Sequence, residues 1–365
     1  MNRRLRAFLR RRGASHEEIA RAEKDGRLAL LTFDKVLLPG RARYKFDDLV
    51  ERAEADPEGA RRIWRALGFP DPPPDARRFT DTDVEALMTL REWFRADVFP
   101  ERTLAGLVQQ TRVVGGSLAK VAEVQSDAVI QALERARKGG LTDEEVAELV
   151  PESLNWDRIS RLMDYALRLQ LRAALWRKYA SGQPGDAGAQ QLSVGFVDLV
   201  GYTALSQELE QSELAQLVER FEELAYDTVA ERGARVVKTI GDEVMFVAEE
   251  PAAAARIALR LTERSAVDEI LPDARAGLAS GPLIAHEGDY YGPVVNLASR
   301  FVEIARPGSV LVSEEFHGQL AEDESFTFQR LRSRRIRDIG RVEVWLLEAV
   351  RRDDAVDSEP KAVDS

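Results

Sequence analysis

The ten residues VKTIGDEVMF, at positions 236–245, contain the feature that decides the fold. Runs rich in Val, Ile and Phe lie on either side of the dipeptide formed by Gly241 and Asp242. Such a dipeptide between two apolar, β-branched runs is typical of a tight turn joining two strands. The pattern therefore predicts a β-hairpin with the carboxylate of Asp242 at its turn and Lys238 shortly before it.

Outward from this hairpin, strand and helix patterns alternate along the chain. Strands are expected at 191–200, 234–240, 243–249, 274–284, 309–313, 326–331 and 342–349, and helices at 206–231, 251–265 and 294–305. The order β-α-β-β-α-β, with additions, is that of a ferredoxin-like domain. We therefore expect an α+β domain over residues 191–350.

Two carboxylates are expected to meet at one end of this sheet. Asp198 ends the first strand, and Asp242 lies at the tip of the hairpin that can lie beside it. Mg²⁺ is commonly held by one or two carboxylates together with waters and substrate phosphates. Taken one at a time, however, an aspartate at a strand end or in a turn is ordinary turn chemistry.

A third element adds to this pair of aspartates. Asn296 and Arg300 are four residues apart on a predicted helix, so they share one face, and Glu303 lies one turn further on. A polar pair at this spacing is by itself typical of a solvated helix face. The pair becomes significant because of its position along the chain, after the two aspartates and at a particular separation from them.

Together the three elements resemble the class III nucleotide cyclases over about residues 190–350. The motif D-x-x-G-[FY]-T is present as Asp198, Gly201, Tyr202 and Thr203, and K-x-x-G-D as Lys238, Gly241 and Asp242. The third motif, D-x-x-G-x-x-V-N-x-A-x-R, is present as Asp289, Gly292, Val295, Asn296, Ala298 and Arg300.

The resemblance implies a role for each matched residue. Asp198 and Asp242 would bind two Mg²⁺ or Mn²⁺ ions on a nucleoside triphosphate. Arg300 would stabilise the charge that develops on the α-phosphoryl group, and Asn296 would orient the ribose. In this family, the aspartates of one chain and the remaining residues of its partner form each site, which implies a head-to-tail homodimer with two equivalent sites.

The base is expected to be adenine. Lys238 can only donate a hydrogen bond, and ionised Asp289 can only accept one. A lysine donating to N1 and an aspartate accepting from N6 match adenine, whereas guanylate-forming relatives usually carry Glu and Cys or similar residues. The expected reaction is the conversion of ATP to 3′,5′-cyclic AMP and pyrophosphate.

Many family members also hold the triphosphate with a basic residue near the last hairpin. The stretch RLRSRRIRDIGRVEVW offers several arginines, namely Arg332, Arg334, Arg335, Arg337 and Arg341. We take Arg337 as the candidate, against the alternative of a solvated basic turn.

Residues 1–180 are predicted to be helical. Ser15 with Glu18, and Thr142 with Glu145, match the capping box that begins a helix. Through FDKVLLPGRARYKFDDL, the W-x-A-L-G-F stretch at 64–69 and LAGLVQQTRVVGGSLAKVAE at 104–123, the region resembles, more weakly, the helical regulatory modules that precede some actinobacterial cyclase domains. In that family the module inhibits or activates the catalytic dimer. FTDTDVEALMTLREWF and VVGGSLAKVAE are also similar to winged-helix regulators, but the mixed charge favours a helical bundle without a nucleic-acid contact.

Composition indicates how the rest of the chain is organised and excludes some kinds of site and partner. The Gly- and Pro-rich segment 181–190 is expected to be a linker, and residues 351–365 a disordered tail. There is no cysteine, so disulfides and thiolate metal sites are excluded. Neither a membrane-spanning run nor a signal peptide is evident, and a cytoplasmic protein is expected. Net charge is −11 and the excess of acid lies in the second half, which makes nucleic acid an improbable partner.

Two alternatives to an active adenylate cyclase stay open. A cyclase-like domain could bind nucleotide without turnover and act as a sensor or regulator. A diguanylate cyclase of the GGDEF type is also ferredoxin-like and carries a Gly-Asp-Glu turn. That family has a second glycine where this chain has Ile240, and it gives no reason for the motif at 289–300.

Overall fold

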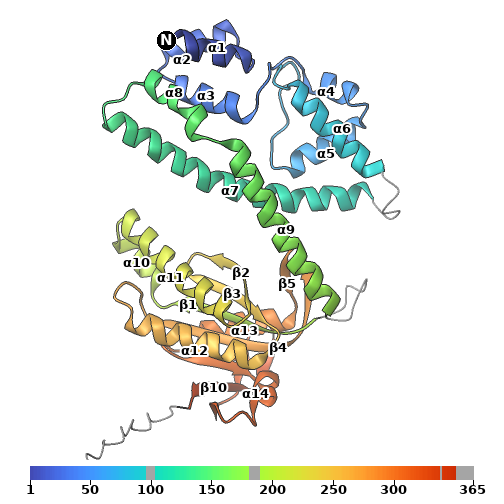
Figure 1. Cartoon of the computed structure of the whole chain (residues 1–365). Helices are drawn as coiled ribbons and strands as arrows, with labels where there is room; N and C mark the ends of the chain where they lie inside the picture. Colours follow the sequence, from blue (N-terminus) through green and yellow to red (C-terminus); the bar gives the residue numbers. More distant parts are fainter. Residues whose placement is uncertain (96–102, 181–189, 338, 351–365) are drawn as a thin grey trace, which may run out of the picture. The chain divides into compact units, whose positions relative to one another are not determined.

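The computed structural model describes residues 1–95, 103–180, 190–337 and 339–350. The chain divides into two compact units, Met1–Trp176 and Arg177–Ser365 (Figure 1). The predicted linker at 181–190 falls almost entirely outside the described residues, and the predicted tail at 351–365 falls wholly outside them. Among the described residues, no helix combines the length and apolarity that crossing a membrane requires.

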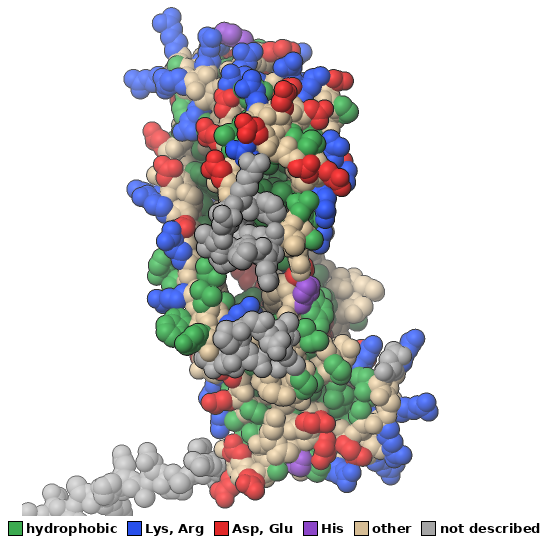
Figure 2. Space-filling model, turned by 90° about the vertical axis from the view of Figure 1, so that its right-hand side faces the viewer, with side chains coloured by type: hydrophobic (Ala, Val, Ile, Leu, Met, Phe, Trp, Pro, Cys, Tyr) green, Lys and Arg blue, Asp and Glu red, His purple; other side chains and the backbone are tan. Residues whose placement is uncertain are grey.

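The first unit is helical in its described residues, as predicted. Its helices are α1 Arg3–Arg11, α2 His16–Lys24, α3 Leu28–Leu37, α4 Phe46–Arg52, α5 Pro57–Ala66, α6 Asp81–Arg95, α7 Leu104–Lys138, α8 Asp143–Ser153 and α9 Trp156–Ala180. Both predicted capping boxes are confirmed: Ser15 and Glu18 begin α2, and Thr142 and Glu145 begin α8. On the face of this unit seen at the upper end of Figure 2, cationic and anionic side chains are interspersed.

Two apolar clusters lie within the helical unit. One joins α1, α2, α3, α7 and α8 around the fully buried Leu9 and Ala147. The other joins α4 and α5 to Phe79, whose ring contacts Phe46 and Trp64 edge-on. Burial of these side chains supplies the main favourable term for folding of this unit.

The second unit is built on an eight-stranded sheet in the described residues. Its path is β2-β3-β1-β4-β6-β10-β7, and β5 pairs with β4 beside it. The pairs are antiparallel except for β4 with β6. The strands are β1 Gln190–Leu199, β2 Arg235–Ile240, β3 Glu243–Ala248, β4 Ala274–His286, β5 Asp289–Tyr291, β6 Val310–Ser313, β7 Phe326–Arg330 and β10 Val344–Ala349, while β8 Arg334–Ile336 and β9 Gly340–Val342 form a separate hairpin.

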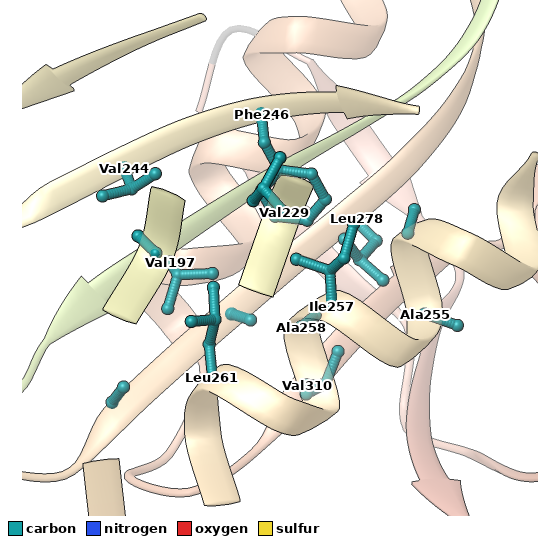
Figure 3. Packing of buried hydrophobic residues seen from close by; sticks show 14 of the residues in the cluster. Val197, Val229, Val244, Phe246, Ala255, Ile257, Ala258, Leu261, Leu278 and Val310 are labelled. Atoms are coloured by element: carbon teal, nitrogen blue, oxygen red, sulfur yellow. The ribbon is translucent and has the colours of Figure 1, made fainter. Parts of the chain in front are cut away.

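Helices cover both faces of the sheet. The helices are α10 Tyr202–Glu208, α11 Gln211–Glu231, α12 Pro251–Val267, α13 Pro293–Ile304 and α14 Glu314–Leu320. On one face, Ile257 and Leu261 of α12 pack with Val197 and Phe246 of the strands (Figure 3). On the other face, α13 packs over Val194, Phe196, Met245, Val247 and Ala279. Strand residues alternate between the two clusters, as the period of a pleated strand requires.

The contact between α13 and β4 is close because β4 carries Gly277. A Cβ atom at this position would lie 2.3 Å from the carbonyl oxygen of Ala298 and 2.8 Å from the amide nitrogen of Val302. Only a glycine lets the helix backbone approach the strand this closely. Gly277 therefore fixes the height of α13, and of its polar residues, above the sheet.

The predicted helix at 206–231 is wrong in one respect. The structure has two helices there, α10 and α11, separated at Leu209 and Glu210. Glu210 begins α11 as its N-cap, and its amide donates to Glu213 Oε2 at 3.0 Å. Glutamate is an uncommon N-cap residue, so nothing in the sequence clearly indicated a helix start at Glu210. The helical spacing of the apolar residues therefore predicted one continuous helix.

Candidate active site

The β2–β3 hairpin and the end of β1 bring Asp198 and Asp242 together. Ile240 pairs with Glu243, so Gly241 and Asp242 form the turn, and Gly241 adopts a positive φ of 62°. Asp198 pairs with Glu243 across β1 and β3, and the amide of Leu199 donates to the carbonyl of Asp242 at 3.2 Å. The Asp198 carboxylate is near enough for its charge to raise the pKa of Asp242. We call Asp198 and Asp242 the carboxylate pair.

Negative charge is concentrated around the carboxylate pair. Partial burial, and after it the Asp198 carboxylate, raises the pKa of Asp242 to about 6. Burial likewise raises the pKa of Glu243 to about 7, with further contributions from Asp198, Asp242 and Glu303. Both shifts have the direction expected when carboxylates are removed from water and placed beside one another.

Arg275 supplies a positive charge to this cluster. It lies opposite Asp198 across β1 and β4, and its Nη2 and Nε atoms donate to Asp198 Oδ2 at 2.7 and 2.9 Å. Its charge lowers the pKa of Asp242, against the effect of burial. Sequence reasoning missed Arg275; the available signal was a cation within the otherwise small and apolar strand ARAGLASG.

The donor set of this cluster suits a hard divalent cation. Oxygen ligands from one or two carboxylates, completed by water and phosphate, are what Mg²⁺ and Mn²⁺ accept. Across the described ranges, no group of three or more His, Cys, Asp or Glu residues is placed to hold a metal on its own. The raised pKa of Asp242 reflects buried negative charge that a bound cation would compensate.

Lys238 and Asp289 form a second group, which we call the Lys–Asp pair. Lys238 Nζ lies 2.5 Å from Asp289 Oδ2, and both side chains are partly exposed. The amide of Tyr290 donates to the other carboxylate oxygen, Oδ1, at 2.8 Å. Both oxygens of Asp289 are therefore oriented before any ligand is present.

A β-bulge places Lys238 on the face of the sheet where β5 lies. Opposite β3, Arg235 pairs with Val247 and Lys238 pairs with Met245, so Val237 is the extra residue. Met245 and Val247 both belong to the cluster under α13. Without the bulge, Arg235 and Lys238 would point to opposite faces; with it, they share one.

Helix α13 carries Asn296 and Arg300. It begins with Pro293 directly after Gly292, whose φ is 141°. Asn296 is exposed, and Arg300 forms an ion pair with Glu303 on the same helix. Among the described residues, no hydrogen bond joins Asn296 or Arg300 to the carboxylate pair or to the Lys–Asp pair.

Arg337 follows the last residue of β8, Ile336, and is exposed. Within a single chain, the structure thus brings together Asp198 with Asp242, and Lys238 with Asp289. Asn296 and Arg300 lie on another element, α13, and Arg337 lies directly after β8. Glu243 is a further carboxylate of the site that sequence reasoning did not single out.

Two domain families match the chain. Residues 186–349 match the adenylate and guanylate cyclase catalytic domain, and residues 2–175 match the adenylate cyclase regulatory domain. An adenylate cyclase of Streptomyces coelicolor is 36% identical over 343 residues, covering 87% of this chain and 89% of the relative. An adenylate cyclase of Glutamicibacter nicotianae is 33% identical over 336 residues, covering 87% and 82%. A pH-sensitive adenylate cyclase of Mycobacterium tuberculosis is 32% identical over 306 residues, covering 80% and 74%.

Proposed function

The chain belongs to the adenylate cyclases that join a regulatory domain to a cyclase catalytic domain, and on this premise we propose that it converts ATP to cyclic AMP at sites shared by two copies. The observation that carries the proposal is that one chain holds both the carboxylate pair and the Lys–Asp pair, with no hydrogen bond joining the two pairs in its described residues. Each group has the chemistry for one part of a metal-bound ATP. A head-to-tail, two-fold dimer would set the carboxylate pair of one copy against the Lys–Asp pair of the other.

The carboxylate pair would hold two divalent ions, Mg²⁺ or Mn²⁺. When bound, these ions lower the pKa of the ribose 3′-hydroxyl and neutralise the triphosphate and the departing pyrophosphate. Arg275 holds Asp198 in place through its two hydrogen bonds and limits the excess negative charge. In the reaction, the 3′-oxygen forms a bond to the α-phosphorus, the bond to the bridging oxygen of pyrophosphate breaks, and the hydroxyl proton is released.

The Lys–Asp pair would select adenine. Lys238 offers a hydrogen bond to N1, and Asp289 accepts one from the N6 amino group. Guanine presents N1–H and O6 instead, so a donor would face a donor and an acceptor would face an acceptor. Such mismatches leave polar groups unpaired and are strongly rejected.

Three further residues would act on the ribose and the phosphates. Arg300 would leave its ion pair with Glu303 to stabilise the charge on the α-phosphoryl oxygens, where a planar guanidinium is well suited. Asn296, one turn earlier on α13, would orient the ribose so that its 3′-oxygen is aimed at phosphorus. Arg337 would bind the triphosphate from the β8–β9 hairpin.

The helical unit would regulate the catalytic one. Its match to the adenylate cyclase regulatory domain supports this role, and one relative that spans both units is named for its pH sensitivity. A flexible Gly/Ser insertion between residues 180 and 190 would weaken mechanical coupling while leaving both units intact. Specific activity should change in this variant; activity equal to that of the parent chain would count against regulation in cis.

Product analysis tests the reaction. Purified protein incubated with ATP and Mn²⁺ should release cyclic AMP and pyrophosphate in equal amounts, and GTP should be a poor substrate. Nucleotide binding without turnover would identify a silent sensor instead. Formation of a dinucleotide from GTP would identify a diguanylate cyclase.

Mixing inactive variants tests the shared site. Asp198→Ala damages the part of the shared site that one copy supplies, and Arg300→Ala damages the part that the other copy supplies. In an equal mixture, half of the dimers contain one copy of each variant, and each such dimer has one complete site out of two. The mixture should therefore regain about a quarter of wild-type activity. The matched control mixes Asp198→Ala with Asp242→Ala, which damage the same half and should recover nothing. Absence of recovery in the first mixture would argue that each chain acts alone.

A further inference from the structure

A second pair of side chains connects β2 to β5 next to the Lys–Asp pair. Arg235 Nη2 donates to Tyr290 Oη at 2.9 Å, and the guanidinium carbon lies 5.4 Å from the centre of the tyrosine ring. Tyr290 is buried, with 9% of its surface exposed, so its hydroxyl needs a partner inside the protein. Arg235 supplies that partner.

The short strand β5 forms few other interactions with its neighbours. It is three residues long and pairs only with β4 among the described strands. The turn that joins them contains Glu287 and Gly288, both with positive φ, at 53° and 84°. This fits a tight type I′ hairpin, which fixes the register of His286 opposite Asp289. The hairpin defines where β5 begins but does not tie it to β2.

Side-chain contacts connect β5 to β2, and they involve two consecutive residues of β5. Lys238 holds Asp289 and Arg235 holds Tyr290, because the bulge at Val237 turns both cations to the same face. The backbone amide of Tyr290 in turn donates to Asp289 Oδ1. Any shift of Tyr290 therefore moves the amide that orients the carboxylate.

We propose that Arg235 and Tyr290 form a clamp that positions Asp289 for reading the base, so that both are positioning residues for substrate selection. The inference rests on the proposed function, because it assigns base recognition to Asp289. In the part of the chain that the structure describes, no hydrogen bond or ion pair joins the clamp to the carboxylate pair. Its loss should therefore weaken the recognition of adenine and leave the chemical step nearly intact.

The test compares ATP with GTP in variants of the clamp. Tyr290→Phe removes the hydroxyl but keeps the ring, and Arg235→Met removes the charge but keeps the length. We expect KM for ATP to rise about tenfold in each, as for one lost hydrogen bond to a charged group, with kcat within about twofold. Discrimination between ATP and GTP should fall by a similar factor, and Arg235→Lys should recover most of it.

A matched control is available in the same unit. The guanidinium of Arg256 also lies 5.4 Å from an aromatic ring centre, that of Phe326, and it pairs with Asp323 on a different part of the domain. Arg256→Met should leave the nucleotide preference unchanged. Equal losses with ATP and GTP in the clamp variants, or an unchanged preference, would overturn the proposal, because a purely structural role lowers both alike.

Binding measurements separate this proposal from the proposed function. The α,β-methylene analogues of ATP and GTP cannot release pyrophosphate, so their dissociation constants report recognition without turnover. If the wild-type chain binds the ATP analogue more tightly and the clamp variants lose that preference, the clamp is supported even when no cyclic AMP forms. If the preference survives in all variants, the clamp is rejected whether or not the chain is active.

Discussion

Asp198 and Asp242 lie at the common end of β1 and the β2–β3 hairpin, where the amide of Leu199, the residue after Asp198, donates to the carbonyl of Asp242 at 3.2 Å. Their proximity follows from the pairing of β1 with β3, which sets Asp198 opposite Glu243. Burial and the charge of Asp198 both disfavour the ionised form of Asp242 and raise its pKa, and Arg275 offsets only part of this effect. A divalent cation would offset the remaining negative charge. Metal binding therefore links the stability of this edge of the sheet to the activity of the protein.

Replacement of Asp242 should separate activity from stability. Asp242→Asn removes one carboxylate of the pair, and we expect turnover to fall by at least about a hundredfold. Without added metal, the melting temperature should stay the same or rise, because a buried charge next to Asp198 is lost. Cyclic AMP assays and thermal melts measure the two effects. Asp227→Asn, an exposed change on α11, serves as the control. Retained turnover would remove Asp242 from the metal site.

Stability of the metal-free protein should depend on pH in a defined direction. The folded-state pKa values of Asp242 and Glu243 are raised, to about 6 and about 7. The folded protein therefore binds more protons than the unfolded chain from about pH 4 to pH 7, so this contribution to stability falls as pH rises through that range. Urea midpoints measured in EDTA between pH 5 and 8 should show it.

The double variant Asp242→Asn with Glu243→Gln is the comparison for that experiment. It lacks both groups and should show a smaller fall in midpoint between pH 5 and pH 8. Added Mn²⁺ should raise the midpoint of the wild-type chain at pH 8 and have little effect on the double variant. Parallel curves for the two proteins would show that these carboxylates do not control the slope.

Loss of Arg275 should move the pH dependence of activity. Arg275 lowers the pKa of Asp242, so Arg275→Met should raise that pKa further and shift the acid limb of the pH–rate profile to higher pH. Activity at pH 6.5 should fall by about tenfold and activity at pH 8.5 by less. Arg275→Lys keeps the charge and should retain the wild-type profile more closely. A uniform loss at every pH would indicate that Arg275 acts on substrate rather than on the carboxylates.

Replacement of both residues of the Lys–Asp pair should change which nucleotide base the protein prefers. With Lys238→Glu and Asp289→Cys together, the donor and the acceptor facing the base are replaced by groups suited to guanine. We expect kcat/KM for ATP to fall by about a hundredfold or more, and GTP to become the better substrate. Rates with both nucleotides, measured beside melting temperatures, test this. A double variant that folds and still prefers ATP would show that other residues select the base.

A methyl group at position 277 should disturb the helix that carries Asn296 and Arg300. Gly277→Ala places a Cβ against the carbonyl of Ala298, so α13 must move, at a cost of about 2 kcal/mol in unfolding free energy. Activity should fall more than stability alone explains. Gly318→Ala is the matched control, because a Cβ there meets nothing within 4 Å. Equal behaviour of the two variants would refute a close α13–β4 contact.

The sequence predicted the parts of the fold that depend on local patterns. The hairpin at Gly241 and Asp242 and the two capping boxes of the helical unit were expected, and the structure confirms them. The meeting of Asp198 with Asp242 was also expected, because it requires that the first strand lie beside the hairpin that follows it, which it does through β3. The hairpin and the capping boxes depend only on residue type and spacing within a short stretch.

Features that depend on strand register were not predicted. The ion pair between Arg275 and Asp198 exists because β1 and β4 align these residues, and nothing near either residue encodes that alignment. The bulge at Val237 is likewise a property of the pairing with β3, since a run of β-branched residues looks the same with or without it. The roles of Asn296, Arg300 and Arg337 stay predictions.

The bulge at Val237 also limits how this protein can change in length. Removal of that residue would leave Lys238 two positions after Arg235 and still opposite Met245, so both cations would stay on the same face of the sheet. Strand β3 pairs with β1 without a bulge and has no extra residue, so a deletion within it would turn every later side chain of the strand to the opposite face. Single-residue deletions among descendants of this gene are therefore expected at the bulge, between Arg235 and Lys238, and not within β1 or β3.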